Sequence, residues 1–459
     1  MKKILTLLII ACLLGSFQAC KQVTPSPTPT LTAAPSNGDA VFTKYVAVGN
    51  SLTAGVANNG LYNASLTTSF PNILAGQFAL VGGGTFAQPT FGAGRENGTG
   101  FLKLLALPSA TNPSPTIVRE TSNTAGRGIG VDGTTPLLDK YTGPLNNLGI
   151  PRIAVKDVLT VGYGLDNPAG FNFFFERLLD NTNAASTYVD FVASKSTDAT
   201  FFSLWIGGND LLQSAAFGVT QSIPDDATFR TNYQALLDKL TANGAKGVVL
   251  NIPNVGTYFN TITLANLQAA VQAAGGPASA TIYITTESGV RAATDEDRFM
   301  LGNQQDPDPT DSDFAYYNYL GSTQVGTNMG GLLPYGLHPN NPLPTAAVID
   351  KDEEAIINTR RVALNAIIQA EAQARDLAFV DINASLFDLA NSADGFTSNG
   401  LTYRTGFITG GIIGIDGIHL TPAGNALVAN EMIKGINAKY NATIPLVNPT
   451  LFEAVVISQ

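Results

Sequence analysis

The sequence TFFSLWI at residues 200–206 is a nearly unbroken apolar run, and the polar peptide GGND follows it directly at 207–210. A short run that is rich in aromatic and branched residues and bounded by glycine predicts a β-strand buried on both faces. The run GVVLNI at 247–252 predicts a second such strand. Between the two, apolar residues recur at helical spacing, at Phe229, Tyr233, Leu236, Leu237 and Leu240. The order strand, helix, strand indicates a crossover unit of a parallel sheet.

The same alternation extends outward in both directions. Residues 45–48 (YVAV) predict a first strand, and residues 377–380 predict a fourth. A long helix is expected at 351–375, and Gly244 stands where the helix between the two central strands would have its C-cap. We therefore predict an α/β fold in three layers, α/β/α, with helices covering a mostly parallel sheet.

Two regions depart from this alternation, at about 82–143 and 257–344. The first is rich in Gly, Thr and Pro, and the second contains the acidic run from Asp306 to Asp313. Long segments without strong periodicity inside a compact domain are usually functional. We expect two long loop insertions that shape a substrate cleft or lid.

The N-terminus has the features of an export signal. Two lysines precede the apolar run at 4–14, which is too short to span a bilayer. The peptide around Ala19-Cys20 resembles a bacterial lipoprotein cleavage box, which implies a lipidated Cys20 after a signal peptide at 1–20; ordinary secretion is the alternative. The Pro/Thr/Ser-rich residues 21–40 predict an extended tether. We expect one folded domain at 41–459, exported and held by a lipid anchor, with the outer membrane as the expected location.

Composition limits the possible partners and cofactors. The formal net charge of −10 and the absence of a Lys/Arg-rich patch argue against nucleic acid. Both cysteines lie in the N-terminal leader, so the body has no disulfide. No zinc-type cluster is visible in the sequence, and we expect neither a metal nor a cofactor.

Two short peptides carry groups suited to hydrolysis by a serine. GNSL at 49–52 follows the first predicted strand, and DGIH at 416–419 supplies a carboxylate and one of only two histidines. A serine nucleophile needs a base within hydrogen-bond reach and a group that orients the base. Ser51 is not in a G-x-S-x-G elbow, which disfavours the α/β-hydrolase fold.

Taken together, the blocks resemble those of the SGNH (GDSL-type) hydrolases over residues 46–433. The peptide 49–52 resembles the first block, 207–210 the third and 416–419 the fifth. The peptide NNLGIPR at 146–152 resembles the second block, with Arg152 where the family has a glycine. The resemblance implies a flavodoxin-like sheet and a serine esterase that acts on lipid esters or acetylated glycans.

The resemblance also implies a role for each matching residue. Ser51 would be the nucleophile, His419 the base and Asp416 the group that orients it. The oxyanion would be held by the Ser51 N–H, the Asn209 side chain and the Arg152 N–H.

Other interpretations of the same residues stay open at this point. Ser51 could cap the helix after the first strand, Asn209 could belong to a polar turn, and the peptide 416–419 could be a turn before a helix with Thr421 at its N-cap and Pro422 at N1. The chain could also be an inactive relative that binds glycan or lipid, or an acyltransferase that uses the same residues.

Three further features are assigned no function. His338 lies in a turn-rich segment and is interpreted as a loop residue. The peptide GIGVDG at 128–133 matches G-x-G-x-x-G, but it neither follows a convincing strand nor opens a helix, so dinucleotide binding is rejected. The acidic run from Asp306 to Asp313 lacks calcium-loop spacing and is interpreted as a solvated loop.

Overall fold

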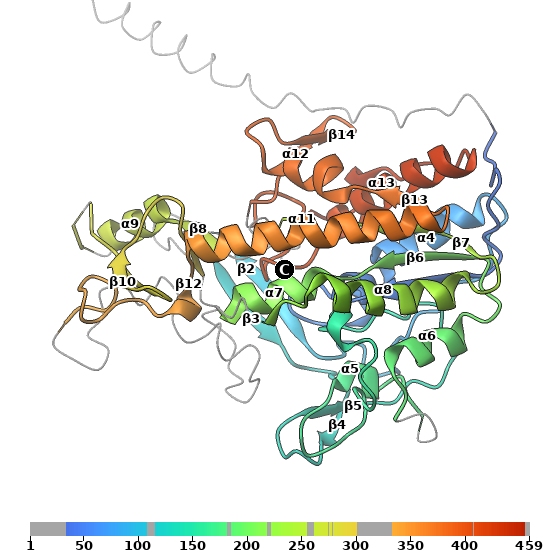
Figure 1. The fold of residues 1–459 in the computed structure, drawn as a ribbon, viewed down its shortest axis with the longest axis horizontal. Coiled ribbons are helices and arrows are strands. Elements are labelled where there is room, and N and C mark those ends of the chain that lie inside the picture. Colours follow the sequence, from blue (N-terminus) through green and yellow to red (C-terminus); the bar gives the residue numbers. More distant parts are fainter. Residues whose placement is uncertain are drawn as a thin grey trace, which may run out of the picture.

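The computed structural model describes residues 34–107, 115–180, 185–217, 222–254, 261–273, 275–277, 279–300, 333–406 and 408–454 (Figure 1). The expected signal peptide, Cys20 and the acidic run from Asp306 to Asp313 lie outside these residues. Among the helices of the described ranges, none is long and apolar enough to cross a membrane.

Four parallel strands form the central sheet, as predicted. They are β1 (Tyr45–Gly49), β6 (Phe201–Trp205), β7 (Lys246–Leu250) and β13 (Ala378–Val380), in the order β1-β6-β7-β13. The register sets Tyr45 opposite Phe201, and Phe201 opposite Lys246. Every residue of β1 and β6 is buried, which explains why these strands are continuous apolar runs with no polar alternation.

Different helices cover the two faces of the sheet. Alternate strand residues point to opposite faces, so Val46 and Phe202 belong to one apolar cluster and Ala47 and Phe201 to the other. The first cluster includes α6 (Tyr188–Lys195), α8 (Asp226–Thr241) and α11 (Lys351–Ala374). The second includes α4 (Phe70–Ala79) and α13 (Pro422–Tyr440). The predicted three-layer α/β/α fold is confirmed.

A fifth segment lies along the outer side of β1. Residues 146–150 run parallel to it: Ala47 N–H donates to Asn146 O (2.9 Å), Leu148 N–H to Ala47 O (2.7 Å) and Ile150 N–H to Gly49 O (2.9 Å). Counted with this segment, the spatial order is 2-1-3-4-5, the flavodoxin-like order. After β1 the chain first adds residues 146–150 on one side of that strand, and then adds β6 on its other side. Open α/β sheets bind ligands at such a switch point, outside the carboxyl ends of the strands.

Of the two helix ends predicted from capping residues, one agrees with the structure. Thr421 caps α13, accepting from Gly424 N–H at 2.9 Å, with Pro422 at the first helical position as predicted. The prediction of Gly244 as a C-cap is wrong by two residues, because α8 ends at Thr241 with Ala242 at its cap. Gly244 instead holds the left-handed turn that follows, at φ +77°.

The first predicted insertion is not an irregular loop. It contains two antiparallel hairpins, β2 (Phe101–Ala106) with β3 (Thr116–Glu120) and β4 (Gly126–Ile129) with β5 (Pro136–Leu138). Residues 128–133 belong to the second hairpin and open no helix. Strands this short show too little alternation to be recognised in a sequence rich in Gly and Thr.

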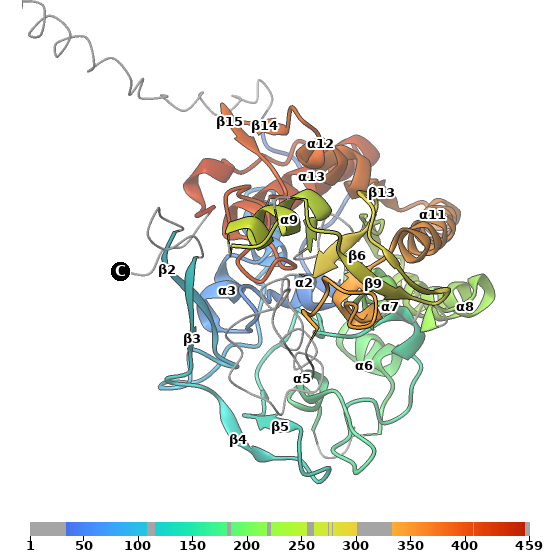
Figure 2. The same ribbon diagram turned by 90° about the vertical axis from the view of Figure 1, so that its left-hand side faces the viewer.

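The second insertion, together with residues 345–349 that follow it, contains regular elements around a separate core. They are β8 (Thr261–Thr263), α9 (Leu264–Ala273), β9 (Tyr283–Thr286), β10 (Gly289–Ala292), β11 (Arg298–Met300), the 3₁₀ turn η5 (Thr345–Ala347) and β12 (Val348–Ile349). Leu267, Ile284 and Phe299 are buried in an apolar cluster separate from those of the sheet. Figures 1 and 2 show this part of the chain beyond the N-terminal end of α11.

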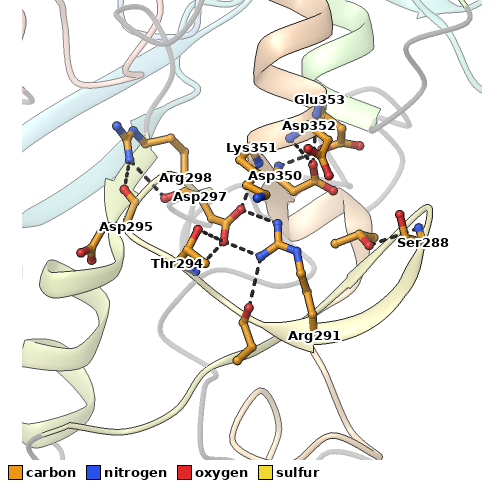
Figure 3. Close-up of polar contacts among 12 residues, drawn as sticks. Ser288, Arg291, Thr294, Asp295, Asp297, Arg298, Asp350, Lys351, Asp352 and Glu353 are labelled. Carbon is orange, nitrogen blue, oxygen red and sulfur yellow. Dashed lines mark hydrogen bonds and ion pairs between the residues drawn. The ribbon is translucent and has the colours of Figure 1, made fainter.

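A buried aspartate joins the second insertion to α11 (Figure 3). Asp297 accepts two hydrogen bonds from the Arg291 guanidinium, at 2.8 and 2.7 Å, and one from Thr294 N–H at 2.6 Å. Its Oδ1 also accepts from Lys351 N–H, the first residue of α11, at 3.0 Å. The carboxylate thus fixes the turn before β11 against the start of the helix.

The remaining elements are short. They are α2 (Ser51–Ala54), α3 (Asn63–Thr67), η1 (Val155–Asp157), α5 (Phe173–Glu176), α7 (Gly208–Phe217), η6 (Asn383–Phe387), α12 (Asp388–Asn391), β14 (Phe396–Ser398), β15 (Leu401–Tyr403) and η7 (Pro449–Leu451).

Candidate active site

Ser51 is the first residue of α2, directly beyond the carboxyl end of β1. The helix cap is Asn50, whose Oδ1 accepts from Leu52 N–H at 3.1 Å. The alternative that Ser51 serves as the cap is therefore wrong. The cap needs a side-chain acceptor one residue earlier, and this leaves the partly exposed Ser51 hydroxyl without a capping role.

Asp416 and His419 form a hydrogen-bonded pair. His419 Nδ1 lies 2.8 Å from Asp416 Oδ2, and both side chains are buried. Asp416 Oδ1 also accepts from the N–H groups of Ile418 (3.0 Å) and His419 (2.9 Å). Within this turn the carboxylate fixes the ring through Nδ1, which leaves Nε2 as the nitrogen that could exchange a proton with a substrate or nucleophile.

The electrostatics of this pair favour a charged Asp416. Burial by itself raises the pKa of the carboxyl group. The charge of His419 and the hydrogen bonds from its ring and from two backbone N–H groups lower the pKa by more than burial raises it. The net result is a pKa below the ordinary value. Asp416 is therefore a carboxylate at neutral pH, able to stabilise an imidazolium.

Two asparagines that follow α2 connect the Ser51 side of the site to the Asp416 turn. Asn59 N–H donates to Asp416 Oδ2 at 2.6 Å, and Ile415 N–H donates to Asn58 Oδ1 at 3.3 Å. Both asparagines have left-handed φ, +51° and +56°. Their role was missed from the sequence, where adjacent asparagines before a glycine indicate only a turn.

The Ser51 hydroxyl and the His419 ring are not hydrogen-bonded to each other in the described part of the chain. Such contacts in free enzymes are often long and tighten when substrate binds. The turns that carry the two residues are nonetheless joined through Asn58 and Asn59.

Asn209 lies in the first turn of α7, directly after β6. Its side chain is buried, and Nδ2 donates one hydrogen bond to Ile153 O at 2.9 Å. A Cβ on Gly208 would lie 3.7 Å from Asn50 Nδ2, so this turn lies beside the turn that carries Ser51. The two peptides that follow neighbouring strands thus meet at one edge of the sheet.

The second block packs directly against α2. Asn147 Nδ2 donates to Thr53 O (2.8 Å) and to Gln88 Oε1 (2.8 Å), while its Oδ1 accepts from Gly149 N–H (3.0 Å). A Cβ on Gly149 would lie 2.3 Å from the backbone nitrogen of Ala54. Only glycine permits this approach, which holds the block against the helix that begins with Ser51.

Arg152 adopts the backbone conformation of a glycine. Its φ is +70°, in the left-handed region where side chains are disfavoured by about 1–2 kcal/mol. Its guanidinium carbon lies 5.4 Å from the centre of the Phe173 ring. The residue lies between two anchored neighbours, Ile150 bonded to Gly49 and Ile153 bonded to Asn209. Arg152 thus holds a left-handed backbone conformation of the kind that glycine adopts without strain.

A role for Asp210 was also missed from the sequence, where it indicated only a polar turn. The carboxylate is buried and accepts from the N–H groups of Val155 (2.7 Å) and Lys156 (3.0 Å). It therefore bonds the turn after β6 to the segment after Arg152. No sequence signal identifies partners this distant along the chain.

His338 Nδ1 accepts from Asn340 N–H at 3.1 Å within its own turn. Among the described residues, no group of three or more His, Cys, Asp or Glu side chains could hold a metal ion.

Comparison with known proteins gives a family and one structure. The sequence profile of GDSL-like lipases/acylhydrolases matches residues 121–432, which include Arg152, Asn209, Asp416 and His419 and begin after Ser51. The crystal structure of an extracellular lipase from Streptomyces rimosus matches with 15% identity and a TM-score of 0.31, covering 87% of this chain and 100% of that one. No curated protein matches the chain.

Proposed function

Because the chain belongs to the family of GDSL-like lipases/acylhydrolases and is an ester hydrolase, we propose that Ser51, His419 and Asp416 form its catalytic triad. The observation that carries the proposal is the 2.8 Å contact between His419 Nδ1 and Asp416 Oδ2, in a turn bonded to the loop that follows Ser51. In the proposal this contact orients His419 as the general base.

In this mechanism Ser51 Oγ attacks the ester carbonyl carbon while His419 Nε2 takes the hydroxyl proton. Asp416 stabilises the imidazolium that results and holds the ring in one tautomer. Collapse of the tetrahedral intermediate breaks the bond to the alcohol, which receives the proton from His419. Water, activated by the same ring, then attacks the acyl group on Ser51 and releases the carboxylic acid.

The developing oxyanion would be held by three N–H donors, from the Ser51 backbone, the Asn209 side chain and the Arg152 backbone. Asn209 Nδ2 carries two hydrogens, of which one is bonded to Ile153 O. The proposal assigns the second to the oxyanion. Loss of one such donor typically lowers kcat by ~100 to 1000-fold.

The first insertion borders this centre and bears on substrate choice. Leu102 N–H donates to Asn58 O at 2.8 Å, and Leu102 and Leu104 are buried with Ile415, next to Asp416. An apolar hairpin therefore packs behind the acid turn. We expect the substrate to be a lipid ester or an acetylated glycan, reached by an exported enzyme that Cys20 anchors to a membrane.

Ester hydrolysis by the wild-type chain and by Ser51→Ala and His419→Ala variants tests the proposal. Short and long p-nitrophenyl esters would both be offered, and we expect both variants to lose ~10⁴-fold or more in kcat. Wild-type activity that persists in Ser51→Ala contradicts the triad. A wild type that is inactive on every ester but binds glycan or lipid favours the binding lipoprotein, and transfer of the acyl group to a sugar favours the acyltransferase.

A further inference from the structure

We propose that Asp210 is a positioning residue of the oxyanion hole, which sets the Arg152 N–H and the Asn209 amide at a fixed separation. The inference rests on the proposed function and deepens it, because it concerns how two of the proposed donors are held. Asp210 itself touches neither substrate nor nucleophile in this account.

The geometry that supports the proposal is a pair of adjacent bonds. Asn209 and Asp210 are consecutive in the first turn of α7, and both bond to the segment that follows Arg152. Asn209 Nδ2 donates to Ile153 O at 2.9 Å, and the Asp210 carboxylate accepts from Val155 N–H (2.7 Å) and Lys156 N–H (3.0 Å). Two side chains therefore fix three peptide groups within four residues of Arg152.

The segment is held from a second direction as well. Asn232, on α8, donates from Nδ2 to Val155 O at 2.9 Å. The peptide groups of Val155 are therefore bonded to α7 on one side and to α8 on the other. With η1 fixed in this way, the part that would most easily shift on loss of Asp210 is the preceding strained turn at Arg152, whose φ is +70°.

The choice of a carboxylate at this position is informative. Asp210 is 1% exposed, and burying a carboxylate costs free energy that an asparagine would avoid. Burial raises its pKa to about 7, helped by the charge of Asp157 and opposed by the two N–H bonds and the charge of Lys156, so the group is mainly a carboxylate above about pH 7. A carboxylate offers an acceptor oxygen to each of two N–H groups, whereas asparagine offers one oxygen and turns an NH₂ group toward the other donor. The second acceptor is what the segment requires.

The test compares Asp210→Asn and Asp210→Ala with a control at another buried aspartate, Asp350→Asn. Asp350 accepts the backbone N–H groups of Asp352 and Glu353, both through Oδ1, and it lies at the start of α11. Rates on a p-nitrophenyl ester are divided by the fraction of Ser51 that a phosphonate ester titrates, so that misfolded protein does not count. We expect both Asp210 variants to lose ~10 to 100-fold in kcat with KM changed by less than about threefold, since small misplacements cost up to about 100-fold, and Asp350→Asn to keep the wild-type kcat.

A double-mutant cycle with Asn209→Ala separates positioning from general stability. If Asp210 acts through the oxyanion donors, Asp210→Asn should cost less in the Asn209→Ala background than in the wild type. Equal losses in both backgrounds, or an unchanged kcat in Asp210→Asn, overturn the inference. Activity that survives Ser51→Ala overturns the proposed function instead, so the two failures are distinguishable.

Discussion

Arg152 has a left-handed backbone conformation that is more usual for glycine. In the proposed mechanism its N–H is an oxyanion donor, a group that arginine supplies as glycine would while φ is held at +70°. The strain is held by the anchored neighbours Ile150 and Ile153, which are bonded to Gly49 and Asn209. An arginine at this position can therefore still offer its backbone N–H to the oxyanion, as the proposal requires.

Replacing Arg152 by glycine tests whether the backbone alone matters. We expect Arg152→Gly to keep kcat within about threefold, because the N–H remains, and to change stability by less than about 1 kcal/mol, because relief of strain offsets the greater entropy of glycine in the unfolded chain. Steady-state kinetics and urea unfolding measure the two quantities. A loss of kcat close to that of removing an oxyanion donor, ~100-fold, would show that the guanidinium itself takes part.

At the scale of elements, the junction between β1 and residues 146–150 determines where the second block lies. Tyr188, on α6, reaches this junction: its buried hydroxyl donates to Leu148 O at 2.7 Å and lies 3.4 Å from Gly49 O. One side chain thus joins the carboxyl end of β1 to the segment that leads to Arg152. The contact explains how α6 can influence the candidate site although Tyr188 is not one of the proposed site residues.

Tyr188→Phe should therefore affect both stability and rate. The substitution removes the bond to Leu148 O and the bond that the hydroxyl accepts from Gly49 N–H at 3.3 Å, which should lower the free energy of unfolding by about 1–2 kcal/mol. Because the hydroxyl also contacts Gly49, two residues before Ser51, we also expect a fall in kcat. Tyr440→Phe is the matched control, since that hydroxyl donates to Gly247 O at 2.7 Å between α13 and β7, away from Ser51. Comparable losses of stability with a fall in kcat for Tyr188→Phe alone would bear out the prediction, and equal effects on kcat would refute it.

At the scale of the whole molecule, the second insertion is attached to the sheet domain through a crowded acidic junction (Figure 3). Glu353, in the first turn of α11, accepts from Asp350 N–H through Oε2 at 3.0 Å, and within the described residues its buried Oε1 has no partner. Burial raises its pKa to about 7, helped by the charges of Asp350, Glu287 and Asp297 and opposed by the bond from Asp350 N–H. The neutral form therefore suits the folded state better than the charged one.

The raised pKa of Glu353 determines the direction in which the free energy of unfolding changes with pH. A carboxyl group whose folded pKa is raised contributes stability that is complete below its unfolded pKa, near 4.5, and that is lost as pH rises through about 7. Glu353→Gln copies the neutral form and keeps an acceptor for Asp350 N–H. We expect the variant to match the wild type near pH 4.5 and to be more stable by about 1–2 kcal/mol at pH 8, below the limit of ~3 kcal/mol that the full shift would give. Urea unfolding at both pH values decides, and a variant less stable than the wild type at pH 8 contradicts the prediction.

Much of the architecture could be predicted from the sequence, because its signals are local. The runs at 45–48, 200–206, 247–252 and 377–380 gave the four strands of the sheet, and Thr421 with Pro422 gave the start of α13. Such patterns depend on a residue and its near neighbours, so they survive without knowledge of the fold. The insertions were recognised as departures, but their hairpins and the separate core of the second were not, since short strands carry little periodicity.

The sequence by itself determined the strands, the capped helices and the candidate groups Ser51, Asn209, Asp416 and His419. Only the tertiary structure decided that residues 146–150 lie beside β1, that Asn59 bonds to Asp416, and that Asp210 holds Val155, 55 residues away. The reason is physical: strand and helix propensity act over a few residues, whereas these hydrogen bonds join segments that become neighbours only when the chain returns to β1 from opposite sides. The candidate site lies beyond the carboxyl ends of β1 and β6, where these segments come together.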